Sequence, residues 1–132
     1  MIKISTKSQY GLRAMAFLAN FPGSIVSLRE VSEREEIPFD YLEKIIGKLE
    51  KENLLKSKKG ARGGYFLAKK PSKIKVGQIV SALEGKTNLV GCLDGRHKCA
   101  RARKCATKRI WQKIQNSLNK TLNSLTLADL LK

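Results

Sequence analysis

The sequence predicts a mainly α fold with a small β wing, in which a winged helix-turn-helix domain precedes a long C-terminal dimerisation helix. Two short amphipathic helices are separated by a tight turn, a cationic hairpin follows them, and a long amphipathic helix lies near the end of the chain. This is the order of parts in a helix-turn-helix with a β wing. We expect the winged helix-turn-helix domain over residues 1–85, a cysteine-containing loop over 86–105, and the long helix with its tail over 106–132.

Apolar side chains at helical spacing predict the first three helices. The first spans residues 5–20, and a capping box at Ser27 and Glu30 opens a second that ends near residue 35. After a turn at Pro38, a third helix covers about 39–51. The side chains on its inner face are Leu42, Ile45, Ile46 and Leu49.

A β hairpin follows the third helix. Residues 54–57 and 65–67 have strand character, and residues 58–63 between them hold two glycines and three cations. Such a tip turns sharply and presents positive charge. A further helix begins near Val76 and ends at Gly85.

The strongest helical pattern lies at about 106–123, and a last short helix follows Thr126. The apolar stripe of the long helix consists of Ile110, Ile114, Leu118 and Leu122. This stripe needs a cover, which is either the chain's own domain or a second copy. We favour a homodimer, because the winged domain alone is too small to cover it.

The charge of the chain indicates a polyanionic partner. There are 27 basic and 11 acidic residues, for a net charge of +16. Eight acids fall within residues 30–52, whereas residues 56–75 hold eight basic residues and no acid, and residues 95–120 hold nine more without an acid. Stretches of one sign favour double-stranded DNA over a merely solvated surface, because phosphate binding releases counterions.

Other classes of protein are disfavoured. No apolar run approaches the roughly 20 residues that cross a bilayer, and residues 1–5 lack the apolar core of a signal peptide. We therefore expect a cytoplasmic protein without a membrane partner. We do not expect an enzyme, because the chain has one histidine and no evident constellation of paired carboxylates.

Candidate DNA-binding residues lie on the third helix and in the hairpin. A recognition helix places its N-terminal residues against base edges, while a wing holds phosphates. Glu43 can accept a hydrogen bond from cytosine, and Lys44 can donate to guanine or phosphate. The positions expected to be exposed on the helix are Phe39, Asp40, Tyr41, Glu43, Lys44 and Lys48, and those in the wing are Lys58, Lys59 and Arg62.

Three cysteines, Cys92, Cys99 and Cys105, fall within fourteen residues of the 86–105 loop. An odd count in a chain without a signal peptide favours metal or redox chemistry over a disulfide framework. Neighbouring cations favour the thiolate form. The wide spacing suits an iron–sulfur cluster better than zinc, and His97 is the nearest candidate for a fourth ligand, although an exposed loop histidine and free thiols remain the alternatives.

Taken together, these features resemble the Rrf family of winged-helix regulators, which includes IscR, NsrR and CymR. The resemblance spans nearly the whole chain and rests on residues 4–14, 40–45, 60–68, 76–85 and 126–131, together with the three cysteines. It implies a homodimeric DNA-binding transcription regulator with a cluster that modulates DNA affinity. It places Tyr41, Glu43 and Lys44 on the recognition helix, Lys59 and Arg62 on the wing, and the three cysteines as cluster ligands.

One departure from the family bears on the type of cluster. Members resembling IscR carry a histidine three residues after the last cysteine, as a ligand of a two-iron cluster, and this chain has Lys108 there. Members resembling NsrR use an acidic side chain of the partner's first helix, near the position of Ser8. The resemblance therefore leaves open a 2Fe-2S or a 4Fe-4S cluster.

We expect a repressor that senses iron–sulfur status, nitric oxide or redox state through this cluster. One alternative is a cluster-free regulator of the same fold, controlled by a partner protein or by thiol oxidation. The other is an iron–sulfur electron-transfer module whose basic surface docks an acidic protein.

Overall fold

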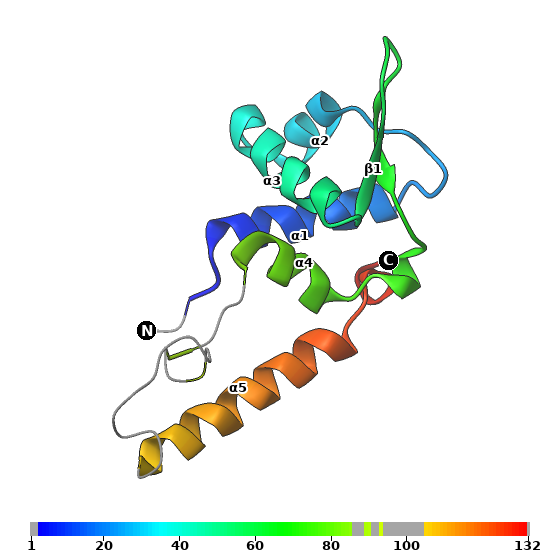
Figure 1. The fold of residues 1–132 in the computed structure, drawn as a ribbon. Helices are drawn as coiled ribbons and strands as arrows, with labels where there is room; N and C mark the ends of the chain where they lie inside the picture. Colours follow the sequence, from blue (N-terminus) through cyan, green and yellow to red (C-terminus); the bar gives the residue numbers. More distant parts are fainter. Residues whose placement is uncertain (1–2, 86–88, 91–92, 94–104, 132) are drawn as a thin grey trace.

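A computed structural model of the chain describes residues 3–85, 89–90, 93 and 105–131 (Figure 1). Five α-helices and one two-stranded sheet are found within these residues, together with short 3₁₀ turns. In chain order the elements are α1 (Thr6–Ala19), α2 (Leu28–Glu35), α3 (Phe39–Lys51), β1 (Leu55–Lys58), β2 (Gly64–Leu67), η1 (Pro71–Lys73), α4 (Val76–Glu84), α5 (Ala106–Ser124) and η3 (Leu127–Leu130). The predicted class, mainly α with a small β wing, is confirmed.

The helices begin and end within about a residue of the predicted positions, because their caps are local in sequence. The hydroxyls of Ser5 and Ser27 each accept a hydrogen bond from the backbone N–H three residues later, at 3.2 Å in both cases. These bonds satisfy amides that have no partner inside the helix. Ser27 thus forms the serine half of the predicted capping box.

The core lies between α1, α3, α4 and the base of the sheet. The predicted inner face of α3 is buried, with exposed fractions of 2% or less for Leu42, Ile45, Ile46 and Leu49. Opposite them, α1 contributes Ala14, Met15 and Leu18, and α4 contributes Ile79 and Leu83. Burial of each large side chain stabilises the fold by about 1.5–3 kcal/mol.

The sheet is an antiparallel hairpin, in which Leu55 pairs with Leu67 and Lys58 with Gly64. The first strand is shifted by one residue from the predicted range, and the second begins one residue earlier than predicted and ends at Leu67 as predicted. At the tip, Gly60 has a φ of 118°, which side chains rarely adopt, and its carbonyl accepts a hydrogen bond from Gly63 N–H at 2.9 Å. The predicted sharp turn is therefore present.

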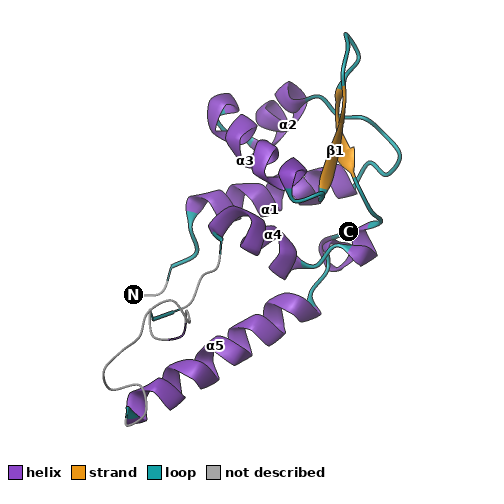
Figure 2. Cartoon of the chain, viewed as in Figure 1, coloured by secondary structure: helices purple, strands orange, loops and turns teal. Residues whose placement is uncertain are grey.

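The segment before α2 fixes the base of this wing. Val26 and Tyr65 exchange backbone hydrogen bonds of 3.0 and 2.8 Å. A Cβ at Gly64 would lie 2.3 Å from the carbonyl oxygen of Val26, so this close approach requires glycine. The isolated bridge between Val26 and Tyr65 thus anchors the hairpin, which projects from the helices in Figure 2.

The chain returns to the core after α5. Val76 N–H donates to the carbonyl of Leu125 at 2.8 Å, and Leu127 N–H donates to that of Ile74 at 3.0 Å. Leu127 is fully buried, and the predicted last helix is the 3₁₀ turn η3. The C-terminal turn thus packs against the winged unit, whereas the predicted boundaries at residues 85 and 105 remain predictions.

The long helix α5 lies below α4 in Figure 1, and Asn123 near its end lies close to Gly77 of α4. Gln115 is the one buried residue that α5 contains. Three residues of its predicted apolar stripe are exposed, by 56% at Ile110, 40% at Ile114 and 36% at Leu118, whereas Leu122 is half-buried. Among the residues that the structure describes, no helix has both the length and the apolarity to span a bilayer.

Candidate nucleic-acid interface and sensor loop

The outer face of α3 is polar and open to solvent. The side chains of Asp40, Glu43, Lys44 and Lys48 are exposed, as the sequence predicts. They point away from the core because the apolar residues of α3 occupy the opposite side. Lys51 is also exposed, seven residues after Lys44. The sequence analysis missed it, although two helical turns from Lys44 place it on the same face.

A rigid turn between α2 and α3 sets the position of this face. Glu36 adopts a left-handed conformation with a φ of 54°, and Ile37 after it is 2% exposed. The Ser32 hydroxyl donates a hydrogen bond of 2.6 Å to the carbonyl of Ile37. The first residues of α3 are thereby held against the core.

Phe39 and Tyr41 do not fit the expectation of full exposure, because both are half-buried. The Tyr41 ring packs edge-on against Tyr10 of α1, with 5.6 Å between the ring centroids. The guanidinium of Arg29 lies 4.9 Å from the centroid of the Phe39 ring. These contacts make both aromatic rings part of the support of α3.

The wing presents Lys58, Lys59 and Arg62, which are all exposed. Tyr65, near the base of the wing, lies close to two carboxylates of α3. Burial, and then the negative charges of Glu50 and Glu43, raise the pKa of Tyr65 above its ordinary value. Because α3 leads directly into β1, the wing and the exposed face of α3 belong to adjoining elements, and Figure 1 shows both on the side of the fold away from α5.

The wing and the exposed face of α3 differ in charge. The wing residues 56–63 are cationic without an acid, which suits phosphate groups. The face of α3 mixes the acids Asp40 and Glu43 with the lysines Lys44, Lys48 and Lys51. Donors and acceptors side by side suit base edges, which present both kinds of group in the major groove.

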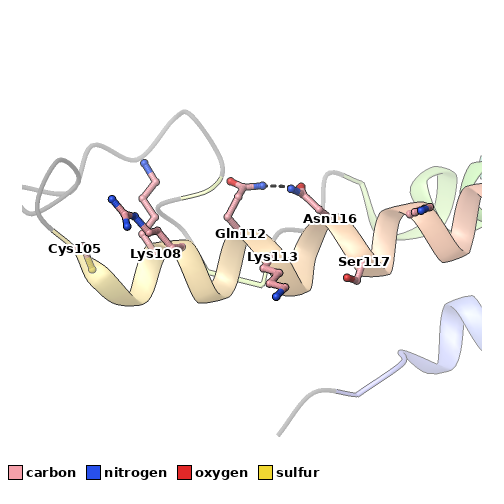
Figure 3. Close-up of a pocket in the computed structure, with 8 residues that line it drawn as sticks. Cys105, Lys108, Gln112, Lys113, Asn116 and Ser117 are labelled. Atoms are coloured by element: carbon pink, nitrogen blue, oxygen red, sulfur yellow. Dashed lines mark hydrogen bonds between the residues drawn. The ribbon is translucent and has the colours of Figure 1, made fainter.

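Cys105 is the one predicted cluster ligand among the described residues. It is the N-cap of α5 and half-exposed, and its Sγ lies 3.1 Å from Thr107 Oγ1. Figure 3 shows it at the end of a cavity of about 560 Å³ along α5, whose lining includes Lys108 and Arg109 and no acid among the described residues. The helix N-terminus and these cations favour negative charge beside Cys105.

The other predicted ligands, Cys92, Cys99 and His97, lie outside the described residues. Within the described part of the chain there is no group of three potential metal ligands. The cysteine ligand set therefore stays a prediction. Cys105 itself suits a soft, anionic ligand site, because its surroundings are cationic.

A polar cluster that the sequence analysis missed joins α4 to α1. Glu84 accepts hydrogen bonds from the hydroxyls of Ser5 and Ser8, the latter at 2.7 Å from Ser8 Oγ to Glu84 Oε1. Ser8 is only 3% exposed. Its hydroxyl already donates a hydrogen bond to Glu84 within the chain, which argues against Ser8 as a cluster ligand. Glu84 and Gly85 immediately precede the cysteine-containing loop, so this clamp lies at the start of the loop.

Comparison with protein families gives a match over residues 4–132 to the Rrf2 model, described as "Iron-dependent Transcriptional regulator". A putative HTH-type transcriptional regulator of Haemophilus influenzae is 36% identical over 131 residues, which cover 98% of this chain and 87% of that protein.

Two solved structures share the fold over nearly the whole chain. T. potens IscR has a TM-score of 0.81 and 41% identity, over 98% of this chain and 85% of that one. CymR, named the global cysteine regulator of B. subtilis, has a TM-score of 0.83 and 34% identity, over 98% and 96% of the two chains. The winged-helix arrangement is thus shared with structures of transcription regulators.

Proposed function

This chain belongs to the Rrf2 family of transcription regulators, and from that premise we propose that it is a cytoplasmic, homodimeric repressor whose affinity for an operator follows iron–sulfur or redox status. The observation that carries the DNA-binding part is the surface formed by α3 and the wing. A face of α3 with charges of both signs and a hairpin whose charges are all positive extend from one core, and Figure 1 shows both on the side of the molecule away from α5.

The exposed face of α3 and the wing have different roles in DNA recognition. The exposed N-terminal half of α3, with Asp40, Glu43 and Lys44, reads base edges in the major groove. The wing residues Lys58, Lys59 and Arg62, with Lys48 of α3, hold phosphates and supply most of the salt-dependent affinity. Phe39 and Tyr41 act mainly by holding α3 in place, because their rings contact Arg29 and Tyr10.

A second copy covers the apolar stripe of α5. The stripe residues Ile110, Ile114 and Leu118 are between 36% and 56% exposed, which is costly for a helix without a partner. Pairing two copies would bring two α3 helices to successive turns of the duplex. The operator would then be nearly palindromic.

Cys92, Cys99 and Cys105 hold an iron–sulfur cluster in this proposal. Such a cluster supplies reactivity toward oxidants and nitric oxide, and it carries negative charge. Around Cys105 the chain provides the α5 N-terminus, Lys108 and Arg109, which offset that charge. Lys108 cannot serve as a ligand while it is protonated, so the fourth ligand and the choice between 2Fe-2S and 4Fe-4S stay open.

A change in the cluster would act on the DNA-binding unit through both ends of the cysteine-containing loop, residues 86–105. Its first end follows Glu84, which is hydrogen-bonded to Ser5 and Ser8 at the start of α1. Its last end is the N-cap of α5. A change in the loop therefore shifts α1 and α5 together, and with them the spacing of the two α3 helices.

Anaerobic purification with absorption spectra and iron and sulfide analysis tests the cluster. Duplex binding is then measured with and without it, using a duplex enriched by the protein from a randomised library. We expect iron and sulfide in the wild type and a different duplex affinity after their removal. Cys99→Ala and Cys105→Ala should lose both, whereas Ser117→Ala, in the same cavity as Cys105, should keep them. Full cluster content and an unchanged DNA response in Cys99→Ala would remove the sensor assignment.

One observation favours a second candidate, a cluster-free regulator of the same fold controlled by thiol oxidation or a partner protein. Lys108 stands where the resemblance to IscR calls for a histidine, and the chain is as similar in fold to the cysteine regulator CymR as to IscR. A colourless anaerobic preparation without iron or sulfide, whose duplex affinity changes with diamide treatment, would establish this candidate instead.

A further inference from the structure

Gly47 stands near the middle of the exposed face of α3, where the fold has no evident use for a glycine. It is an exposed residue of a helix that runs from Phe39 to Lys51. A glycine inside an exposed helix costs about 1 kcal/mol relative to alanine. Such a cost calls for a reason in packing, in backbone conformation or in binding.

Packing and backbone conformation give no reason at Gly47. A Cβ built there would meet nothing within 4 Å, and its φ is not positive. Other glycines of the chain differ in this respect. A Cβ at Gly11 would strike Leu83, one at Gly77 would strike Asn123, and Gly60 has a positive φ. The remaining reason is a close approach by something outside the chain.

The surroundings of Gly47 indicate what approaches. On the helical wheel it lies away from the buried face, one turn after Glu43 and Lys44 and one turn before Glu50 and Lys51. A patch of bare backbone is thus bordered by two lysines and two acids, and two of these neighbours, Glu43 and Lys44, are the proposed base-reading residues. The cations can reach phosphates on either side while the uncovered helix surface moves toward the floor of a groove.

We propose that Gly47 faces the floor of the major groove one turn after the base-reading residues Glu43 and Lys44, and that its missing side chain sets the depth to which this part of α3 enters the groove. This inference rests on the proposed DNA reading by α3. The groove is about 12 Å wide and a helix with side chains is about 10–12 Å across. Little room is left, so one added side chain on the leading face keeps the neighbouring residues from the base edges.

Gly47→Ala and Gly47→Leu test this, because the fold should gain from both while DNA binding loses. The unfolding temperature should rise by roughly 2–4 °C for alanine. Affinity for the duplex that the wild type enriches most from a randomised library should fall about tenfold for alanine and about a hundredfold for leucine, the range that one lost base-pair contact spans. Affinity for an unrelated duplex at low salt should stay within about twofold, because phosphate contacts supply it.

Ser81→Ala is the matched control. Ser81 is exposed on α4, and the change also favours helix formation without touching the face of α3. It should leave both affinities as they are. Light scattering on every variant checks that the oligomeric state is unaltered.

The outcomes are distinct. Wild-type affinity in both Gly47 variants would overturn the inference and leave the proposed function intact. Equal losses of duplex affinity in the alanine and leucine variants would also overturn it, because they would indicate a need for backbone flexibility rather than space. A loss of affinity caused by dimer dissociation would overturn it as well. A wild type that binds no duplex would remove the proposed function and this inference with it.

Discussion

The winged-helix unit and α5 differ in how far their apolar side chains are buried. In the winged-helix unit, residues from four helices, the sheet and the C-terminal turn bury one another, and ten large side chains are less than 2% exposed. In α5, Ile110, Trp111 and Ile114 are each 38% exposed or more. Both regions show clear amphipathic patterns, so the pattern alone does not distinguish a completed core from an interface.

The difference shows where each region obtains its stability. The winged-helix unit has a core of its own, closed by Leu127 from the far end of the chain. Among the described residues, most of the apolar stripe of α5 is uncovered, which supports the proposal that a second copy covers it.

Leu49→Ala should cost about 2–5 kcal/mol in the free energy of unfolding, because it leaves a cavity in a fully buried site. Urea titration at several protein concentrations measures it. Leu118→Ala on α5 is the counterpart, and its effect should grow on dilution, because it acts through association. If both costs depended on concentration alike, the contrast between the regions would be lost.

Leu118→Lys should weaken dimerisation about a hundredfold, roughly 2.7 kcal/mol, because it places a charge in the apolar stripe twice per dimer. Sedimentation velocity over a dilution series gives the dissociation constant. Asn116→Lys adds the same cation within the α5 cavity and should leave the oligomeric state unchanged. A Leu118→Lys protein that stays fully dimeric would count against α5 as the interface.

Glu84→Gln should lower the free energy of unfolding by about 1–2 kcal/mol, because it removes a charged acceptor from two serine hydroxyls. It should also reduce the change in duplex affinity that follows cluster loss, since the loop would be less firmly joined to α1. Thermal unfolding and duplex titration measure the two effects. A stability loss with a fully retained response would make the clamp structural only.

Arg62→Ala should reduce duplex affinity modestly and lower the slope of log K against log salt by about 0.9, the value for one phosphate contact. Fluorescence anisotropy with a labelled duplex at several salt concentrations measures it. Lys73→Ala removes an exposed cation outside the wing and should leave the slope unchanged. An equal change in both variants would mean that the wing has no special role.

Sequence reasoning located most of the fold, because the relevant signals are local. Apolar spacing and serine caps define α1, α2 and α3, and the glycines and cations of the hairpin define the wing. The same periodicity predicted which charges of α3 are exposed, since they lie opposite Leu42 and Ile46. The DNA-binding roles of these side chains remain predictions.

Contacts between distant parts of the chain were beyond such reasoning. Leu127 enters the core through a backbone pairing with Ile74, and Glu84 meets Ser5 and Ser8 from 79 and 76 residues away. Phe39 and Tyr41 are half-buried because Arg29 and Tyr10 contact their rings. No short-range sequence pattern predicts contacts between such residues.

The most direct test of the account is a duplex-binding titration of the purified wild-type protein from low to high ionic strength. The account predicts tight binding at low salt, a steep linear fall of log K with log salt, and a preference for the enriched duplex over an unrelated one. Failure to bind any double-stranded DNA at low salt, with or without iron and sulfide in the sample, would contradict it.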